Sequence, residues 1–141
     1  MIDSRTAPYA ALVLRVALGV TFLAHAWLKL FVFSPAATVK FFDSLGLPEY
    51  VAYLVMAIEV VGGIALILGV LARWVALVLA VELIGMIVLV HGGKGWLFTN
   101  AAGGWEYPGL LAVAAIALAL LGNGAYALSI WSRSAVASAQ A

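Results

Sequence analysis

The stretch AIEVVGGIALILGVLARWVALVLAVELIGMIVLVHG, from Ala57 to Gly92, contains two apolar runs that are interrupted only around Arg73. A helix that crosses a membrane needs roughly 20 predominantly apolar residues. With their flanking residues, the runs over 50–71 and 73–91 both approach that length. Because the interruption leaves room only for a tight turn, the stretch predicts an antiparallel pair of membrane-spanning helices.

Two further apolar stretches flank this pair, over 9–33 and 105–122. The composition fits membrane-spanning helices, since 67% of the 141 residues are hydrophobic and 9% are charged, whereas about a quarter of the residues of a soluble domain are charged. Residues 1–141 are therefore expected to form one all-α domain. We expect an integral membrane protein, an antiparallel four-helix bundle whose main partner is the lipid bilayer.

The charge and the cysteine content exclude several classes of function. The formal net charge of +1 gives no electrostatic reason to expect nucleic acid as a partner. The 141 residues include no cysteine, which excludes disulfides, thiolate metal sites and thiol–disulfide relays within them. The sequence also has no histidine or acidic motif with metal-ligand spacing, so no metal site is predicted.

The distribution of positive charge predicts the orientation. We define side A as the face with both termini and the turn at Arg73, and side B as the opposite face. Side A has the arginines and side B the lysines: Arg5, Arg73 and Arg133 against Lys40 and Lys94, with Lys29 near a helix end. This weak asymmetry favours side A as the cytoplasmic side, so both termini are expected in the cytoplasm.

The loop between the first two spans predicts a short helix of its own. Ser34 is a favourable N-cap residue, and Pro35 suits the first helical position. Gly46 and Pro48 then end the helix. We expect this helix to lie in the membrane interface on side B. It serves either as a packed connector or as a lid over an opening toward the lipid.

Charged side chains within spans are costly in lipid and usually face the interior of the bundle. Glu59 lies twelve residues before Leu71, and Glu82 lies eleven residues after it. At about 1.5 Å per residue, both carboxyl groups lie at a similar depth near the middle of the membrane. Two carboxylates there are expected to hold at least one proton unless a cation compensates them. Arg15 is the candidate cation of this intramembrane cluster, or else it extends to the headgroups of side A.

Polar and aromatic side chains of similar depth near side B predict a ligand-binding pocket; they are His25, His91, Lys94, Trp105 and Glu106. Glu106 has two interpretations. Its charge suits the N-terminus of the last helix, or it faces a histidine or Lys94 across the mouth of the bundle. Two histidines alone do not predict haem, so the cofactor stays unknown at this point.

These features resemble the DoxX family of small bacterial membrane proteins. Short blocks carry the resemblance by their order: Arg15, GVTFLAHAWLKL over 19–30, FFDSLGLP over 41–48, EVVGGIALILGVLARWVAL over 59–77, His91, GGWEYPGLL over 103–111 and LLGNGAYALS over 120–129. The chain departs from the family near its end. Gly122-Asn123-Gly124 stands where the family often has Gly-Pro-Gly, and Ala127-Leu128-Ser129 stands where it tends to have Ser-Leu-Asp.

The resemblance implies a four-helix, multi-pass protein of the bacterial inner (plasma) membrane. The family takes its name from subunits linked to the quinone-coupled oxidation of sulfur compounds. Many members are described as oxidoreductases whose reaction is not established, and others resemble accessory subunits of oxidative-stress enzymes. The resemblance therefore implies redox chemistry near a quinone but no particular reaction.

Three functions fit these observations. A quinone- or lipid-interacting oxidoreductase subunit would bind a polar headgroup at His25, His91 and Glu106, and would exchange electrons with a redox partner subunit. A proton-coupled transporter of a small molecule would use Glu59 and Glu82, and so few helices would then favour a homo-oligomer. A non-catalytic membrane anchor or assembly subunit of a redox complex is the third. The resemblance favours the first function, and it leaves open which residues are catalytic and whether the chain is an enzyme by itself.

Overall fold

The computed structural model describes residues 3–128, and these residues form helices and loops without a β-strand. The elements in chain order are α1 (Ala7–Trp27), the π-helix η1 (Leu28–Val32), α2 (Pro35–Ser44), α3 (Glu49–Leu68), α4 (Ala72–Met86), the π-helix η2 (Ile87–His91), the 3-10 helix η3 (Gly92–Lys94) and α5 (Glu106–Leu121). The all-helical prediction is confirmed, with five α-helices in the described part of the chain.

Three helical stretches are long and apolar enough to cross a membrane: Ala7–Val32, Glu49–Leu68 and Ala72–Lys94. They coincide with the first three predicted spans. The fourth predicted span corresponds to α5, which is apolar but has only 16 residues. The short helix predicted in the first loop is α2, and its N-cap Ser34 accepts a hydrogen bond from the Ala37 N–H over 3.4 Å.

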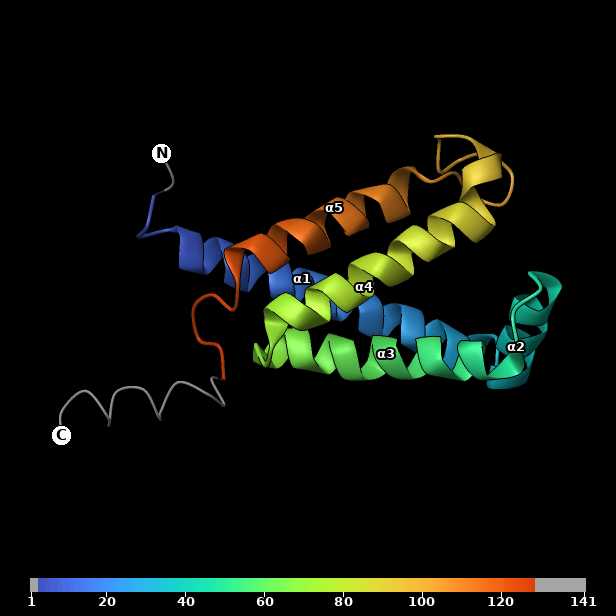
Figure 1. Cartoon of the computed structure of the whole chain (residues 1–141), viewed down its shortest axis with the longest axis horizontal. Helices are drawn as coiled ribbons and strands as arrows, with labels where there is room; N and C mark the ends of the chain where they lie inside the picture. The colour runs from blue at the N-terminus through green and yellow to red at the C-terminus, as the bar shows by residue number, and fades with distance from the viewer. Residues whose placement is uncertain (1–2, 129–141) are drawn as a thin grey trace.

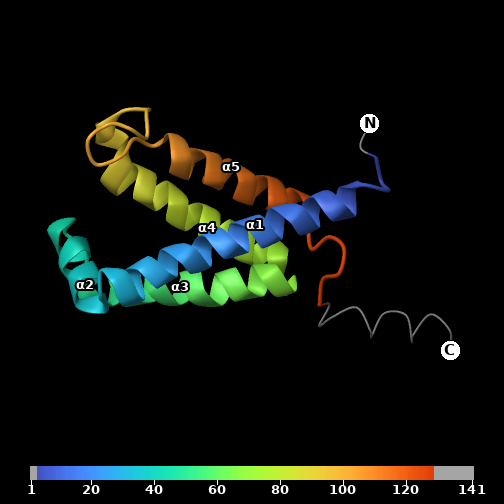
Figure 2. The same cartoon turned by 180° about the vertical axis from the view of Figure 1, so that it is seen from behind.

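The helices pack as two pairs, α1 against α3 and α4 against α5. Figures 1 and 2 show that the two pairs meet at the end that carries the α3–α4 turn and diverge toward the opposite end, where α2 and the loop before α5 lie. Both ends of the described chain lie at the convergent end. Side A is thus the closed end of the molecule, and side B is the open end.

Small residues permit the close approach of the helices. A Cβ atom placed on Gly19 of α1 would lie 2.7 Å from the Gly63 carbonyl oxygen of α3. The helices α4 and α5, which pack together, likewise have buried alanines: Ala72, Ala76, Ala80, Ala112, Ala115 and Ala119. Because the helical backbones touch along these stripes, the bundle leaves little space where the stripes run.

Arg15 helps to close side A. Its side chain is buried, and its Nη2 donates a hydrogen bond to the Ala125 carbonyl oxygen over 2.6 Å. Gly69, in the left-handed conformation that ends α3, leaves the space that the guanidinium occupies. Arg15 therefore neither reaches the headgroups nor bonds to Glu59 or Glu82, but ties the segment after α5 to α1 and α3.

We predict that Gly63→Ala lowers the free energy of unfolding by about 1–3 kcal/mol, because the added Cβ would lie 2.9 Å from the Gly19 carbonyl oxygen. Gly85→Ala is the matched control, because a Cβ there meets nothing within 4 Å. It should be neutral, or stabilising by up to about 1 kcal/mol through helix propensity. Unfolding titrations in detergent compare the two, and equal effects would contradict the packing described above.

Candidate functional site

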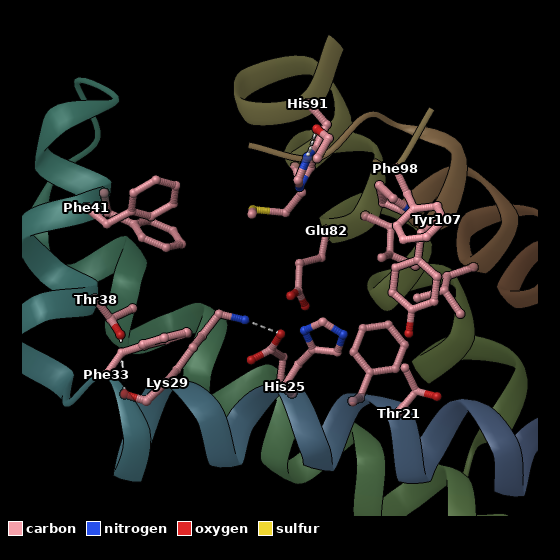
Figure 3. Close-up of a pocket in the computed structure, with 18 of the residues that line it drawn as sticks. Thr21, His25, Lys29, Phe33, Thr38, Phe41, Glu82, His91, Phe98 and Tyr107 are labelled. Atoms are coloured by element: carbon pink, nitrogen blue, oxygen red, sulfur yellow. Dashed lines mark hydrogen bonds and ion pairs between the residues drawn. The ribbon is translucent and has the colours of Figure 1, made fainter. Parts of the chain in front are cut away.

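A cavity of about 660 Å³ lies between the two helix pairs toward side B. Its walls are mostly apolar or aromatic, and its ionisable side chains are His25, Lys29, Glu59, Glu82, His91 and Tyr107. These residues come from every long helix and from both π-helices. Figure 3 shows His25, Lys29 and Glu82 around the lower part of the cavity and His91 above them. The divergence of the helix pairs therefore produces a pocket that combines apolar walls with a few convergent polar groups.

The polar floor of the cavity is a salt bridge between Lys29 of η1 and Glu59 of α3. The two side chains are 16% and 4% exposed, so the pair is withdrawn from solvent. Helical side chains lean toward the N-terminus of their own helix. Because α1 and α3 are antiparallel, Lys29 leans toward side A and Glu59 toward side B. Each side chain therefore points toward the level of the other.

Lys29 is held at the end of α1 by a local change in helical winding. The backbone from Leu28 to Val32 forms a π-helix. The Thr38 hydroxyl of α2 lies 3.3 Å from the Lys29 carbonyl oxygen and 3.1 Å from the Ser34 carbonyl oxygen. Thr38 thus links α2 to the turn that presents the lysine. Single-turn π segments in α-helices are common at functional sites.

Glu82 of α4 points into the same cavity from the opposite wall (Figure 3). The Oε2 atoms of Glu82 and Glu59 are both buried without a hydrogen-bond partner among residues 3–128. The two glutamates predicted to share a depth thus line one cavity. The compensating cation is Lys29 and not, as the sequence had suggested, Arg15.

The two histidines line the same cavity at different heights. The His25 ring stacks on the Tyr107 ring of α5, with centroids 6.2 Å apart and an interplanar angle of 28°. His91 Nδ1 lies 3.0 Å from the Gly103 carbonyl oxygen in the loop before α5. These contacts fix the orientation of both imidazole rings, and both rings border the space between the helix pairs.

Three of the predicted pocket residues lie outside the cavity lining. Trp105 is 37% exposed, and its ring packs edge-on against Trp96. Lys94 is exposed, and its carbonyl oxygen accepts a hydrogen bond from Asn100.

Glu106, the third, is half-buried and accepts a hydrogen bond from the Phe98 N–H over 3.2 Å. Its side chain fixes the preceding loop in addition to standing at the N-terminus of α5, where a negative charge is favourable. The backbone N–H groups at that terminus, those of Gly104, Trp105 and Glu106, donate to the carbonyl oxygens of 95–97 in the same loop. Glu106 therefore does not line the cavity itself, but it holds in place the loop whose residues Phe98, Gly103 and Gly104 do.

The sequence did not indicate that Lys29 pairs with Glu59, or that Thr38 and Tyr107 belong to the site. The lean of helical side chains could have indicated the ion pair, because it brings Lys29 about one turn nearer to Glu59. Thr38 and Tyr107 carry no such signal. They reach the cavity through the placement of α2 and α5, which depends on long-range packing.

Comparison with known proteins places this arrangement in a family. A family model described as DoxX matches residues 10–92. The chain belongs to the DoxX family. This confirms the resemblance read from the sequence, and with its apolar helices it identifies a membrane protein with transmembrane helices.

This DoxX-family chain is also similar to a Bacillus subtilis (strain 168) protein named "Putative oxidoreductase CatD". The two sequences are 37% identical over 112 residues, which cover 79% of this chain and 78% of the relative. No solved structure matches the chain. The part that the DoxX model matches contains His25, Lys29, Glu59, Glu82 and His91, whereas Tyr107 lies beyond it.

We predict that Lys29→Met destabilises this DoxX protein by about 3 kcal/mol or more, because it leaves the buried Glu59 carboxylate without its cation. The double variant Lys29→Met, Glu59→Met should recover most of that loss, since it removes both charges. Lys40→Met, at an exposed lysine of α2, is the control and should change little. The measurement is the free energy of unfolding in detergent of each variant, including Glu59→Met alone. If the loss in the double variant equals the sum of the losses in the two single variants, the two residues are not coupled.

Proposed function

We propose that this DoxX protein binds a quinone-type lipid in the cavity between its helix pairs and acts as a subunit of a membrane oxidoreductase. The observation that carries the proposal is the cavity itself, which is about 660 Å³ in volume and combines apolar walls with ionisable groups on its floor and at its upper end. Pockets for small ligands commonly have volumes of about 300–1,000 Å³ and a few polar groups of this kind.

A quinone matches both properties of the cavity. The lysine ammonium and the imidazole of His25 can donate hydrogen bonds to the oxygen atoms of a headgroup, and His91 Nε2 can accept one from a headgroup hydroxyl. Phe33 and Phe41, which line the cavity on the side of α2, are 58% and 43% exposed and offer an apolar route for the isoprenoid tail. In this proposal α2 serves as the lid that the sequence analysis considered, and it stands over the lipid entrance.

The name of the Bacillus subtilis relative supports an oxidoreductase rather than a passive membrane protein. We propose that the side chains of this chain bind and orient the quinone, and that electrons pass to or from a partner subunit or a bound redox cofactor. That partner can be a soluble enzyme docked on the membrane surface or another membrane subunit. Assembly into a homo-oligomer belongs to the same proposal.

The membrane topology that accompanies this proposal has four spans. At about 1.5 Å per residue, α5 is about 24 Å long, somewhat less than the hydrocarbon thickness of about 30 Å. The loop before α5, which Glu106 and Trp105 anchor on side B, would occupy the part of the membrane thickness that α5 does not span. We place side A, with both termini, in the cytoplasm and the protein in the bacterial inner membrane. Arg133, which contributes to that orientation, lies outside the described residues.

The proposal predicts that a short-chain quinone stabilises the protein in detergent. At a hundredfold excess over its Kd, one bound ligand adds about 2.7 kcal/mol to the free energy of unfolding. Thr21→Trp should abolish this gain, because Thr21 lines the cavity and the indole would fill part of it. Val20→Trp is the matched control, because Val20 is the neighbouring residue of α1, is 55% exposed and lies outside the lining.

Ubiquinone-1 and menaquinone-1, measured by thermal unfolding, are suitable probes. A gain in the parent and in Val20→Trp, with none in Thr21→Trp, supports binding in the cavity. The absence of any gain with both quinones contradicts the proposal. If quinone stabilises Thr21→Trp as much as the parent protein, the quinone binds outside this cavity.

A proton-coupled transporter of a small molecule is the second candidate, and the shared cavity of Glu59 and Glu82 favours it. The cavity would then hold a polar substrate beside an exchangeable proton. Proteoliposomes separate the two candidates. Substrate movement that follows an imposed pH gradient, and that Glu82→Gln abolishes, supports transport, whereas quinone binding without such movement supports the first proposal.

A further inference from the structure

We infer that Glu59 and Glu82 bind one proton between them, and that this shared proton latches the two helix pairs together across the cavity. When the proton is lost, the pairs separate and the cavity widens, so the cavity opens as the pH rises. The latch acts on the cavity whatever ligand the cavity binds.

The two glutamates come from opposite helix pairs. Glu59 belongs to α3, which packs against α1, and Glu82 belongs to α4, which packs against α5. Their carboxyl groups lie within hydrogen-bonding reach of each other, and Figure 3 shows the Glu82 side chain pointing toward the salt bridge of Lys29. The ring stack of His25 on Tyr107 is an aromatic contact between the pairs at this level.

The contact of the two glutamates is the polar link between the pairs around the cavity. Within residues 3–128, the other side-chain hydrogen bonds and salt bridges of the lining residues each stay within one pair and its adjoining segments; they are those of Thr21, Lys29, Thr38 and His91. A change at the two carboxyl groups therefore acts directly on the distance between the pairs.

The contact of the two carboxyl groups requires a proton. Glu59 Oε1 accepts a hydrogen bond from Lys29, whereas the Oε2 atoms of both glutamates are buried without a partner in the described part of the chain. An ionised carboxylate only accepts hydrogen bonds, so two ionised carboxylates cannot bond to each other. One added proton makes one carboxyl group a donor to the other. A single shared proton can therefore satisfy both open oxygen atoms.

The charge around the pair determines what loss of the proton does. Within residues 3–128, the other ionisable groups that line the cavity are His25 of α1, Lys29 of η1, His91 of η2 and Tyr107 of α5. With the shared proton, the two carboxyl groups carry one negative charge, which the lysine balances. Without it they carry two, and the second charge is uncompensated in apolar surroundings, where it is costly. Separation of the helix pairs lets water reach the carboxylates and relieves that cost.

The fold allows the pairs to separate at one end. The pairs already diverge toward side B, whereas the α3–α4 turn joins them at side A (Figures 1 and 2). Arg15 of α1 also bonds at side A to Ala125, in the segment after α5. The pairs therefore turn about side A when the proton is lost, and their separation is largest at side B.

Distances between pairs of spin labels test the latch. Because the sequence has no cysteine, labels can be attached at introduced cysteines alone. Tyr53→Cys in α3 with Leu110→Cys in α5 reports on side B, and these residues are 49% and 67% exposed. Ile64→Cys in α3 with Leu120→Cys in α5 reports on side A, where the residues are 47% and 78% exposed. Both distances are measured in detergent from about pH 6 to about pH 9, a range in which an ordinary lysine keeps its charge.

We expect the side B distance to increase toward alkaline pH by about 2–3 Å or more, because a water between two carboxyl oxygens replaces one hydrogen bond of about 2.7 Å with two. The side A distance should not change. Glu82→Gln supplies a permanent donor to Glu59, so it should keep the short side B distance over the whole range. Glu82→Met binds no proton and should also lack the pH response, which keeps the test decisive if the Gln variant does not fold. Glu49→Gln, at an exposed glutamate of α3, is the matched control and should respond as the parent does.

A pH response on side B that the parent and Glu49→Gln share, and that both Glu82 variants lack, supports the latch. A side B distance that is the same at every pH overturns it. A response that both Glu82 variants retain also overturns it, because His25 or His91 would then be responsible. Equal widening on side A and side B contradicts it as well, since the whole bundle would then loosen.

Discussion

The ion pair of a partly buried lysine and a buried glutamate in an apolar bundle constrains most of this structure. A buried charge is stable only when it is paired, and removing either partner would leave the other as an isolated charge in a low-dielectric interior. The Lys29–Glu59 pair therefore fixes the register of α1 against α3, since the two side chains meet only when both lean toward a common level. The π-helical turn and the bond from Thr38 then hold the lysine where that register needs it.

The bundle opens on side B, between the helix pair that contains this salt bridge and the pair of α4 and α5. Small residues let the helices approach closely, and Gly19 of α1 and Gly63 of α3 leave no room for a Cβ atom between them. Toward side B the two pairs diverge (Figures 1 and 2), and polar side chains line the space between them. The result is a cavity with a charged floor, two oriented imidazole rings and aromatic walls. Such a cavity suits an amphiphile with a polar ring and an apolar tail.

The sequence predicts the parts of this arrangement that depend on composition and on counting along a helix. Apolar run lengths locate α1, α3 and α4, and equal distances from the Arg73 turn place Glu59 and Glu82 in one cavity. Counting along the helices could not show which cation pairs with Glu59. Arg15 bonds to Ala125, 110 residues away, and Lys29 is presented by a π-helical turn that no propensity predicts. Glu106 likewise bonds to a loop whose path depends on carbonyl groups at 95–97. Long-range packing decided the contact of Arg15, and local backbone geometry that composition does not predict decided the other two.

If the cavity between the helix pairs holds a quinone-type lipid, as we propose, that lipid should leave the membrane together with the protein. The most direct measurement is mass spectrometry of the solvent extract from protein purified out of a quinone-containing bacterial membrane, with quinone and phospholipid quantified per chain. We expect quinone to co-purify in an amount that approaches one molecule per chain and exceeds its share of the surrounding lipid. An extract whose quinone content equals that of the bulk membrane, or that contains only phospholipid, would contradict it.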